Sequence, residues 1–204
     1  MKCGATEQAK HLINKAPRAV VEQFEKQYDH SMTAFAKVTH DMAYQTANLF
    51  IKETEKNTSE PISCKAGCGA CCHQPVFVSD DEFVNIREYL IDTGWKLDKD
   101  RVQMQLDATD DGIYKEISVP DRRCVFLGEN SSCSIYEARP LLCRRYNVYS
   151  DPKHCASGAT KEIKYDVSPR TEGHLSAYFA YYGGKTFQAH LVDVPEIFAD
   201  KSEV

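Results

Sequence analysis

The stretch Cys64-Lys65-Ala66-Gly67-Cys68-Gly69-Ala70-Cys71-Cys72, CKAGCGACC, places four thiols within nine residues. Such a stretch suits four kinds of site: a disulfide framework, a thiol redox centre, a zinc site, or ligands of an iron–sulfur cluster. Gly67 and Gly69 separate the thiols, and glycine lets a backbone turn tightly, often with positive φ, around a metal. The sequence therefore predicts an irregular loop whose conformation is set by the bonds that its sulfurs form.

The other cysteines extend this pattern along the middle of the chain. Nine cysteines are many for a chain kept in a reducing compartment, which favours metal ligation or redox chemistry over disulfides. Cys3 stands apart and is interpreted as a free terminal thiol. The remaining eight form two groups of four, which we take as candidate metal ligands: Cys64, Cys68, Cys71, Cys72, Cys124, Cys133, Cys143 and Cys155.

The composition of the whole chain indicates one ordinary globular domain, residues 1–204. With 204 residues and 42% hydrophobic content, the chain can bury a hydrophobic core large enough to fold without disulfide bonds. No apolar run suits a secretory signal or a membrane span, so we expect a cytoplasmic protein. A net charge of -5 gives no electrostatic reason to bind nucleic acid or an anionic membrane.

Residues 17–57 predict one long helix, because no Gly interrupts them and the only Pro is Pro17, which suits a first helical turn. An apolar stripe recurs every seven residues, at Val21, Tyr28, Phe35, Met42 and Leu49. At about 1.5 Å per residue this helix would be on the order of 55 to 60 Å long, so we expect it to kink or to reach a partner. We favour a core helix packed within the chain; a homodimer through this helix is the alternative.

Shorter elements are expected between the cysteine groups. Ser79 reads as the N-cap of a helix over residues 80–92, and a weaker helical pattern covers 98–116. Residues 125–133 suggest a two-strand ribbon, and 135–146 a short helix that carries Cys143. The predicted fold is thus mainly α: a long N-terminal helix and a helical domain, with a small irregular cysteine-rich metal-binding subdomain and a short β-ribbon.

Several segments together resemble the YkgJ-type cysteine-cluster family, described as a zinc- or iron-chelating domain with the CxxCxxCC signature. The segments are Cys64-x3-Cys68-x2-Cys71-Cys72, Cys124-Val125-Phe126-Leu127, Cys133-Ser134-Ile135-Tyr136-Glu137-x-Arg139-Pro140, and Cys143-Arg144 followed by Tyr146. The resemblance covers 64–155, which we treat as a metal-binding module. The helix at 17–57 and a C-terminal extension, 156–204, lie outside it.

The resemblance implies eight metal-binding thiols but no settled biochemical activity. A similar module joined to a flagellin lysine methylase implies an iron–sulfur centre there, and this chain is too short to hold the rest of such an enzyme. The resemblance also gives weight to Arg139 and Arg144, which we expect to donate to a thiolate-rich centre. We expect Tyr136 to pack over the centre and exclude water. His73 and His154 are read as supporting residues rather than ligands.

Ligand spacing favours an iron–sulfur cluster, with 4Fe-4S first, over Zn2+. Structural zinc sites usually combine pairs of short C-x2-4-C knuckles, whereas the second cysteine group contains none. Closely spaced thiols joined by distant ones are typical of cluster ligation. A structural zinc-binding interaction module is the alternative.

The expected function is to hold a metal centre that supports electron transfer, sensing or the chemistry of a protein partner, whose identity the sequence does not give. We expect no enzymatic activity of the chain by itself, because no paired carboxylates, Ser-His-Asp order or phosphate loop can be picked out. A thiol redox switch at Cys71-Cys72 is the alternative from another class. Neighbouring cysteines form strained, labile disulfides, but that reading explains only two of the eight thiols.

Overall fold

Helices dominate the computed structural model, which describes residues 16–65, 67–145, 148–155, 161, 163–164 and 168–199, so that Cys3 and Tyr146 lie outside it. The helices are α2 (Arg18–Phe35), α3 (His40–Lys56), α4 (Asp80–Asp92), α5 (Lys99–Asp110), α6 (Leu141–Arg144), α7 (Pro169–Tyr182) and α8 (Phe187–Leu191). Short 3-10 turns occur at η1 (Tyr136–Ala138), η2 (Pro152–Cys155) and η3 (Pro195–Ile197). The mainly α fold is confirmed. Each helix in these ranges is too short or too polar to cross a membrane.

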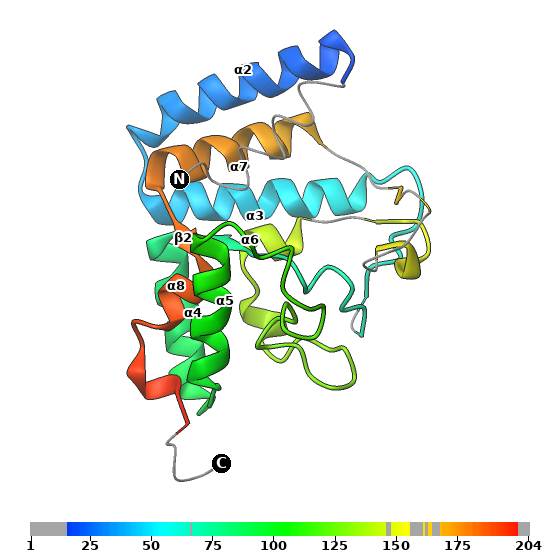
Figure 1. Cartoon of the computed structure of the whole chain (residues 1–204). Helices are drawn as coiled ribbons and strands as arrows, with labels where there is room; N and C mark the ends of the chain where they lie inside the picture. Colours follow the sequence, from blue (N-terminus) through cyan, green and yellow to red (C-terminus); the bar gives the residue numbers. More distant parts are fainter. Residues whose placement is uncertain are drawn as a thin grey trace.

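Three helices form one layer, in which α7 lies between α2 and α3 (Figure 1). The contact of α2 with α7 is close at Gly173, where a Cβ atom would lie 2.6 Å from the carbonyl oxygen of Phe24. Ser31, a polar residue in the buried face of α2, has its Oγ 2.9 Å from Nδ1 of the buried His174. The apolar face of α2 is therefore covered within the chain.

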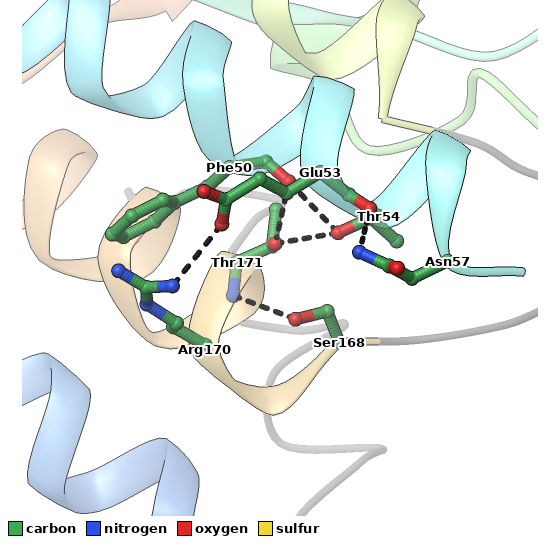
Figure 2. Close-up of polar contacts among 7 residues, drawn as sticks. All are labelled: Phe50, Glu53, Thr54, Asn57, Ser168, Arg170 and Thr171. Carbon is green, nitrogen blue, oxygen red and sulfur yellow. Dashed lines mark hydrogen bonds and ion pairs between the residues drawn. The ribbon is translucent and has the colours of Figure 1, made fainter.

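Polar contacts fix α7 against the C-terminal end of α3 (Figure 2). The Thr171 hydroxyl lies 2.8 Å from that of Thr54 and donates to the carbonyl of Phe50 at 3.2 Å. Arg170 donates to Glu53 at 3.1 Å, and its guanidinium carbon lies 4.0 Å from the centre of the Phe50 ring. These contacts hold the layer together where the chain leaves α3 for the cysteine loop.

The long helix expected at 17–57 is two helices, because residues 36–39 leave helical geometry. Thr39 adopts extended backbone angles and accepts from the amide of Met42, so it is the N-cap that starts α3. The break also shifts the buried face. Met42 and Leu49, expected in the apolar stripe, are 56% and 59% exposed, while Ala43, Ala47, Phe50 and Ile51 are buried instead.

The helices α4, α5 and α8 form the second half of the molecule (Figure 1). The predicted helix at 80–92 is present as α4: Ser79 accepts from the amide of Glu82, and Gly94 follows the helix with a positive φ. The core of this half draws on distant parts of the chain: Val78, Phe83, Ile86, Leu90, Leu97, Val102, Phe126, Ile135, Phe187, Leu191, Val194, Ile197 and Phe198.

A two-stranded antiparallel sheet joins the two halves. It pairs β1 (Phe77–Val78) with β2 (Lys185–Thr186), with Phe77 opposite Thr186. The chain enters β2 through Gly184, whose φ is positive and where a Cβ atom would lie 2.7 Å from the carbonyl oxygen of Val78. The ribbon expected at 125–133 is present only as a single antiparallel bridge between Leu127 and Cys133.

Candidate metal centre

The first cysteine group lies in a loop of successive tight turns. The amide of Cys68 donates to the carbonyl of Lys65, and that of Cys72 to Gly69, each at 3.0 Å. Gly67 has φ of 86°, a conformation that side-chain-bearing residues rarely adopt. These turns reverse the chain within nine residues and gather its thiols on one short segment.

The two cysteine groups are in direct contact. The amide of Cys124 donates to the carbonyl of Cys72 at 2.8 Å, joining residues far apart in the sequence. Next to this bond the buried Gly69 faces Leu127, whose Cδ1 would lie 2.8 Å from a Cβ atom at that position. Glycine at this position lets the first loop lie against the second segment without displacing the Leu127 side chain.

Buried residues anchor the thiols of the second group. Phe126 and Ile135 follow Cys124 and Cys133 by two positions, and each is 1% exposed. The amide of Ser134 donates to the carbonyl of Phe126 at 2.8 Å, which ties the two anchors together. Burial raises the pKa of the Cys124 and Cys133 thiols, and hydrogen bonds from the backbone amides of Phe126 and Ile135 to their sulfurs oppose that rise. These hydrogen bonds favour the thiolate form, which binds metals.

Cys143 belongs to α6, which is shorter than the helix expected at 135–146, because residues 136–138 form the separate 3-10 turn η1. Pro140 precedes the helix, and Leu141, its first residue, is fully buried. The amide of Leu141 donates to Oε1 of the buried Glu82 at 2.6 Å. After the helix, Arg145 forms an ion pair of 3.0 Å with Glu172 of α7. The position of Cys143 thus depends on α4 and α7.

These elements enclose a cavity of about 450 Å3. Its wall contains six of the eight candidate ligands: Cys68, Cys71, Cys72, Cys124, Cys133 and Cys143. Apolar and aromatic side chains, among them Phe126, Ile135 and Phe187, make up much of the rest, with Tyr114 and Gln188. The cavity brings together thiols from the first loop, the second segment and α6.

Burial and mutual repulsion act on these thiols. Burial raises the pKa of Cys124 to about 11, with a further contribution from the charge of Cys133. Burial also raises the pKa of Cys143 well above its usual value, and the charges of Cys124, Cys71 and Cys133 add to this. A hydrogen bond with Cys72 raises the pKa of Cys71. Several thiolates here would repel one another, and a bound cation would relieve that repulsion.

Cys64 and Cys155 lie beside the cavity rather than in its wall. Ser63 lies next to Cys64. Its amide donates to the carbonyl of Val148 at 2.8 Å, and its hydroxyl donates to the carbonyl of Ser150 at 2.6 Å. This brings the loop next to the segment that ends at Cys155. Burial raises the pKa of both thiols, and the charge of Cys68 contributes to both shifts.

Thiols are suitable ligands for a metal centre, but these thiols are not close enough together to bind one ion. All eight described cysteines are free thiols. Within the part of the chain that the structure describes, no three His, Cys, Asp or Glu side chains are close enough to hold one metal ion. Six thiols therefore surround a shared space without forming a tight single-ion site.

The three residues expected around the centre have different surroundings. Arg139 lines the cavity, and its guanidinium carbon lies 3.5 Å from the centre of the Tyr136 ring. Burial raises the pKa of the Cys64 and Cys133 thiols, and the charge of Arg139 opposes that rise. Tyr136 lines the cavity too, but it is 40% exposed and so covers only its edge. Arg144, expected to donate to the thiolates, instead donates to the Tyr44 hydroxyl at 3.3 Å and lies outside the cavity wall. Its place on α6 turns it towards α3.

The expected supporting histidines also lie outside the wall. Nδ1 of His73 is 3.4 Å from the carbonyl oxygen of Ala70 in its own turn, and His154 lies in η2. Sequence reasoning missed Glu82, Glu172 and Gln188, which support or line the site. Only Glu82 carried a signal, as the third residue after the N-cap Ser79, and that signal indicates a capping box rather than a contact with Leu141.

Comparison with known proteins gives one family match. The family model CxxCxxCC, described as "putative zinc- or iron-chelating domain", matches residues 63–166, just over half of the chain. The match contains all eight candidate ligands, α4, α5 and α6, and ends before α7. No curated protein and no solved structure matches the chain.

Proposed function

Because this chain belongs to the CxxCxxCC family of zinc- or iron-chelating domains, we propose that it holds an iron–sulfur cluster in the thiol-lined cavity. The cluster would serve electron transfer, oxidant sensing or the chemistry of a protein partner. One observation carries this proposal: six thiols from three separate segments face one cavity. A disulfide framework or a single thiol pair would not require six thiols to line the same cavity.

The spacing of the thiols favours a cluster over a single zinc ion. Zinc bonds to sulfur at about 2.3 Å, so four tetrahedral ligands must lie roughly 3.8 Å from one another. No three candidate donors among the described residues are gathered to hold one ion. In a cluster each thiolate can bind a different iron atom, so the sulfurs stand farther apart. The cavity of about 450 Å3 suits the wider arrangement.

The chain's own residues would tune such a centre. When bound, an iron–sulfur cluster supplies one-electron redox chemistry. The amides of Phe126 and Ile135 donate to the sulfurs of Cys124 and Cys133, and such bonds stabilise negative charge on the ligands. Arg139 adds a positive charge at the wall, and the apolar wall formed with Phe187 limits the access of water.

A thiol switch at Cys71-Cys72 is the second candidate function. Their thiols are hydrogen-bonded, and Cys71 is the one exposed cysteine among the eight described. Against this, the same hydrogen bond raises the pKa of Cys71, and a reactive cysteine needs a lowered pKa to form the thiolate. Metal binding also accounts for the other four thiols of the wall.

The deciding experiment is anaerobic purification followed by iron, zinc and acid-labile sulfide analysis and a visible spectrum. Brown protein with iron and sulfide in stoichiometric amounts is the expected result. Colourless protein with stoichiometric zinc would replace the cluster by a structural zinc-binding interaction module. Metal-free protein with a reversible Cys71-Cys72 disulfide would establish the switch instead.

Alanine substitutions then test which thiols hold the centre. We expect Cys124→Ala and Cys143→Ala, each in the cavity wall, to lose most of the bound iron and sulfide. Cys64→Ala and Cys155→Ala are the matched controls and should keep it, because these thiols lie outside the wall. Loss of iron in the controls alone would move the centre towards the 148–155 segment.

A further inference from the structure

We propose that Glu82 and Glu172 are positioning residues of the metal centre, which hold the two ends of α6 and so fix Cys143. The inference rests on the proposed function, because it concerns the same centre. It assigns a role to two buried acids that the cysteine pattern does not explain.

Glu82 holds the beginning of α6. The first amides of a helix have no partner within the helix, and Leu141 supplies the first of them. This amide donates to Glu82 Oε1 at 2.6 Å, and Glu82 is 1% exposed. Helix α6 has only four residues, and a single isolated turn is unstable because nucleation is unfavourable. Its geometry must therefore come from outside contacts.

Glu172 holds the other end. Its carboxylate lies 3.0 Å from the guanidinium of Arg145, and the side chains are 10% and 6% exposed. Buried ion pairs are geometrically demanding, since an unpaired charge in the interior is costly. Leu141 adds an apolar anchor in the core of the α3 and α7 layer. The single turn that carries Cys143 is thus held by a polar bond at each end.

Cys143 lies between these two anchors, two residues after Leu141 and two before Arg145. The other thiols of the cavity wall lie on loops and turns, so Cys143 is the thiol whose place is set by the helical scaffold. Residues that orient metal ligands typically change metal affinity 10- to 100-fold when they are removed. Glu172 also shows that a helix beyond the family-matched residues contributes to the centre.

Anaerobic titration of the metal-free protein with Co2+ tests the inference, since thiolate-to-cobalt absorption reports the number of bound sulfurs. If the wild-type protein binds no Co2+, the same variants are compared by the iron and sulfide they retain after anaerobic reconstitution with Fe2+ and sulfide. We expect Glu82→Leu to bind Co2+ roughly 10- to 100-fold more weakly, with reduced thiolate absorption. Glu82→Gln keeps an oxygen that accepts from Leu141 and should bind within about threefold of wild type. Glu88→Gln, at an exposed position of the same helix, is the matched control and should have no effect.

A double-mutant cycle with Cys143→Ala separates positioning from general destabilisation. If Glu82 acts through Cys143, Glu82→Leu should weaken Co2+ binding no further once Cys143 is absent. An equal loss in both backgrounds would overturn the inference, as would wild-type binding by a folded Glu82→Leu protein. If Glu82→Leu does not fold, the same cycle with Glu172→Gln decides, and failure of both to fold would assign the acids to folding alone.

The two proposals can fail separately. A wild-type protein that binds neither cobalt nor iron would remove the proposed function, and the inference with it. If the wild-type protein binds metal but the effects of Glu82→Leu and Cys143→Ala on metal binding are additive, only the inference is removed.

Discussion

At the scale of single residues, Glu82 is an acid whose charge the fold disfavours. Burial raises its pKa to about 7, against 4.5 for an ordinary glutamate, although the amides of Leu141 and Ser79 and the charge of Arg144 oppose this. Between these two values the folded protein binds more protons than the unfolded chain. The free energy of unfolding should therefore fall as pH rises from about 4.5 to about 7.

The substitution Glu82→Gln should remove this pH dependence. The variant should be more stable than wild type by roughly 2 to 3 kcal/mol at about pH 8 and nearly equal to it at about pH 4.5. Urea unfolding of the metal-free proteins at several pH values gives the difference. A constant difference across this range would show that Glu82 does not titrate as its surroundings indicate, and Glu88→Gln should show no difference.

The sequence predicted the eight thiols as a set, because their spacing and the motifs around them are local signals. It did not predict which residues orient them. Glu82 meets Leu141 across 59 positions, and Arg145 meets Glu172 across 27, so no local pattern links either pair. The hydrogen bond of Arg144 to Tyr44 was likewise not predicted, since the direction of this side chain depends on how α6 sits on α3.

At the scale of elements, the crossing of α2 and α7 depends on the absent side chain of Gly173. We expect Gly173→Ala to lower the free energy of unfolding by about 1 to 3 kcal/mol, because its Cβ would lie 2.6 Å from the Phe24 carbonyl oxygen and force the helices apart. Thermal or urea unfolding measures this change. In an uncrowded helix the same substitution stabilises by roughly 0.5 to 1 kcal/mol, so the sign is diagnostic.

The exposed Ala180 on the same helix supplies a control. Ala180→Gly should cost about 1 kcal/mol through helix propensity alone. A stabilised Gly173→Ala protein would mean that α2 and α7 lie farther apart than described.

The elements that the sequence predicted well are those with clear ends. Ser79 lies at the start of α4 and Gly94 follows its end, and both residues act on the neighbouring backbone, so the sequence alone reveals them. A kink was one of the two outcomes expected for residues 17–57, but the position of the break between α2 and α3 was not predicted, because it contains neither Gly nor Pro. The one local sign was Thr39, an N-cap residue followed by Asp41 in the first turn of α3. The polar Ser31 is buried in α2 because it pairs with His174, which lies 143 positions away, so no local pattern could predict this contact.

At the scale of the whole molecule, the described residues form two apolar cores. One lies in the layer of α2, α3 and α7, and the other beneath α4, α5 and α8. Helices contribute all of the first core and about half of the second, so we expect removal of the metal to leave most of the helical circular dichroism unchanged. The cysteine loop at 57–76 and the segment at 111–135 should become sensitive to protease, because few helical contacts hold them.

Limited proteolysis with and without a chelator, with mass mapping of the first cleavage sites, tests this expectation. Loss of most helical signal on chelation would show instead that metal binding drives the folding of the whole chain. Cleavage within α2 or α7 before the loops would also contradict it.

The mainly α class was predictable from helical periodicity, whereas the arrangement of the two cores was not. The pairing of β1 with β2 joins residues more than one hundred positions apart through two-residue strands, too short to carry a pattern. The cavity combines loop thiols with Phe187, a residue of the C-terminal part that the cysteine motifs do not reach.

The core beneath α4 matters for moving the cysteine motif into another protein. Its C-terminal contributors, Phe187, Leu191, Val194, Ile197 and Phe198, come from outside the 63–166 stretch that defines the family. A fragment cut at those limits would leave the apolar sides of α4 and α5 open to water and prone to self-association. Anyone grafting the cysteine motif onto another scaffold would need to carry this tail along, or design a substitute for it.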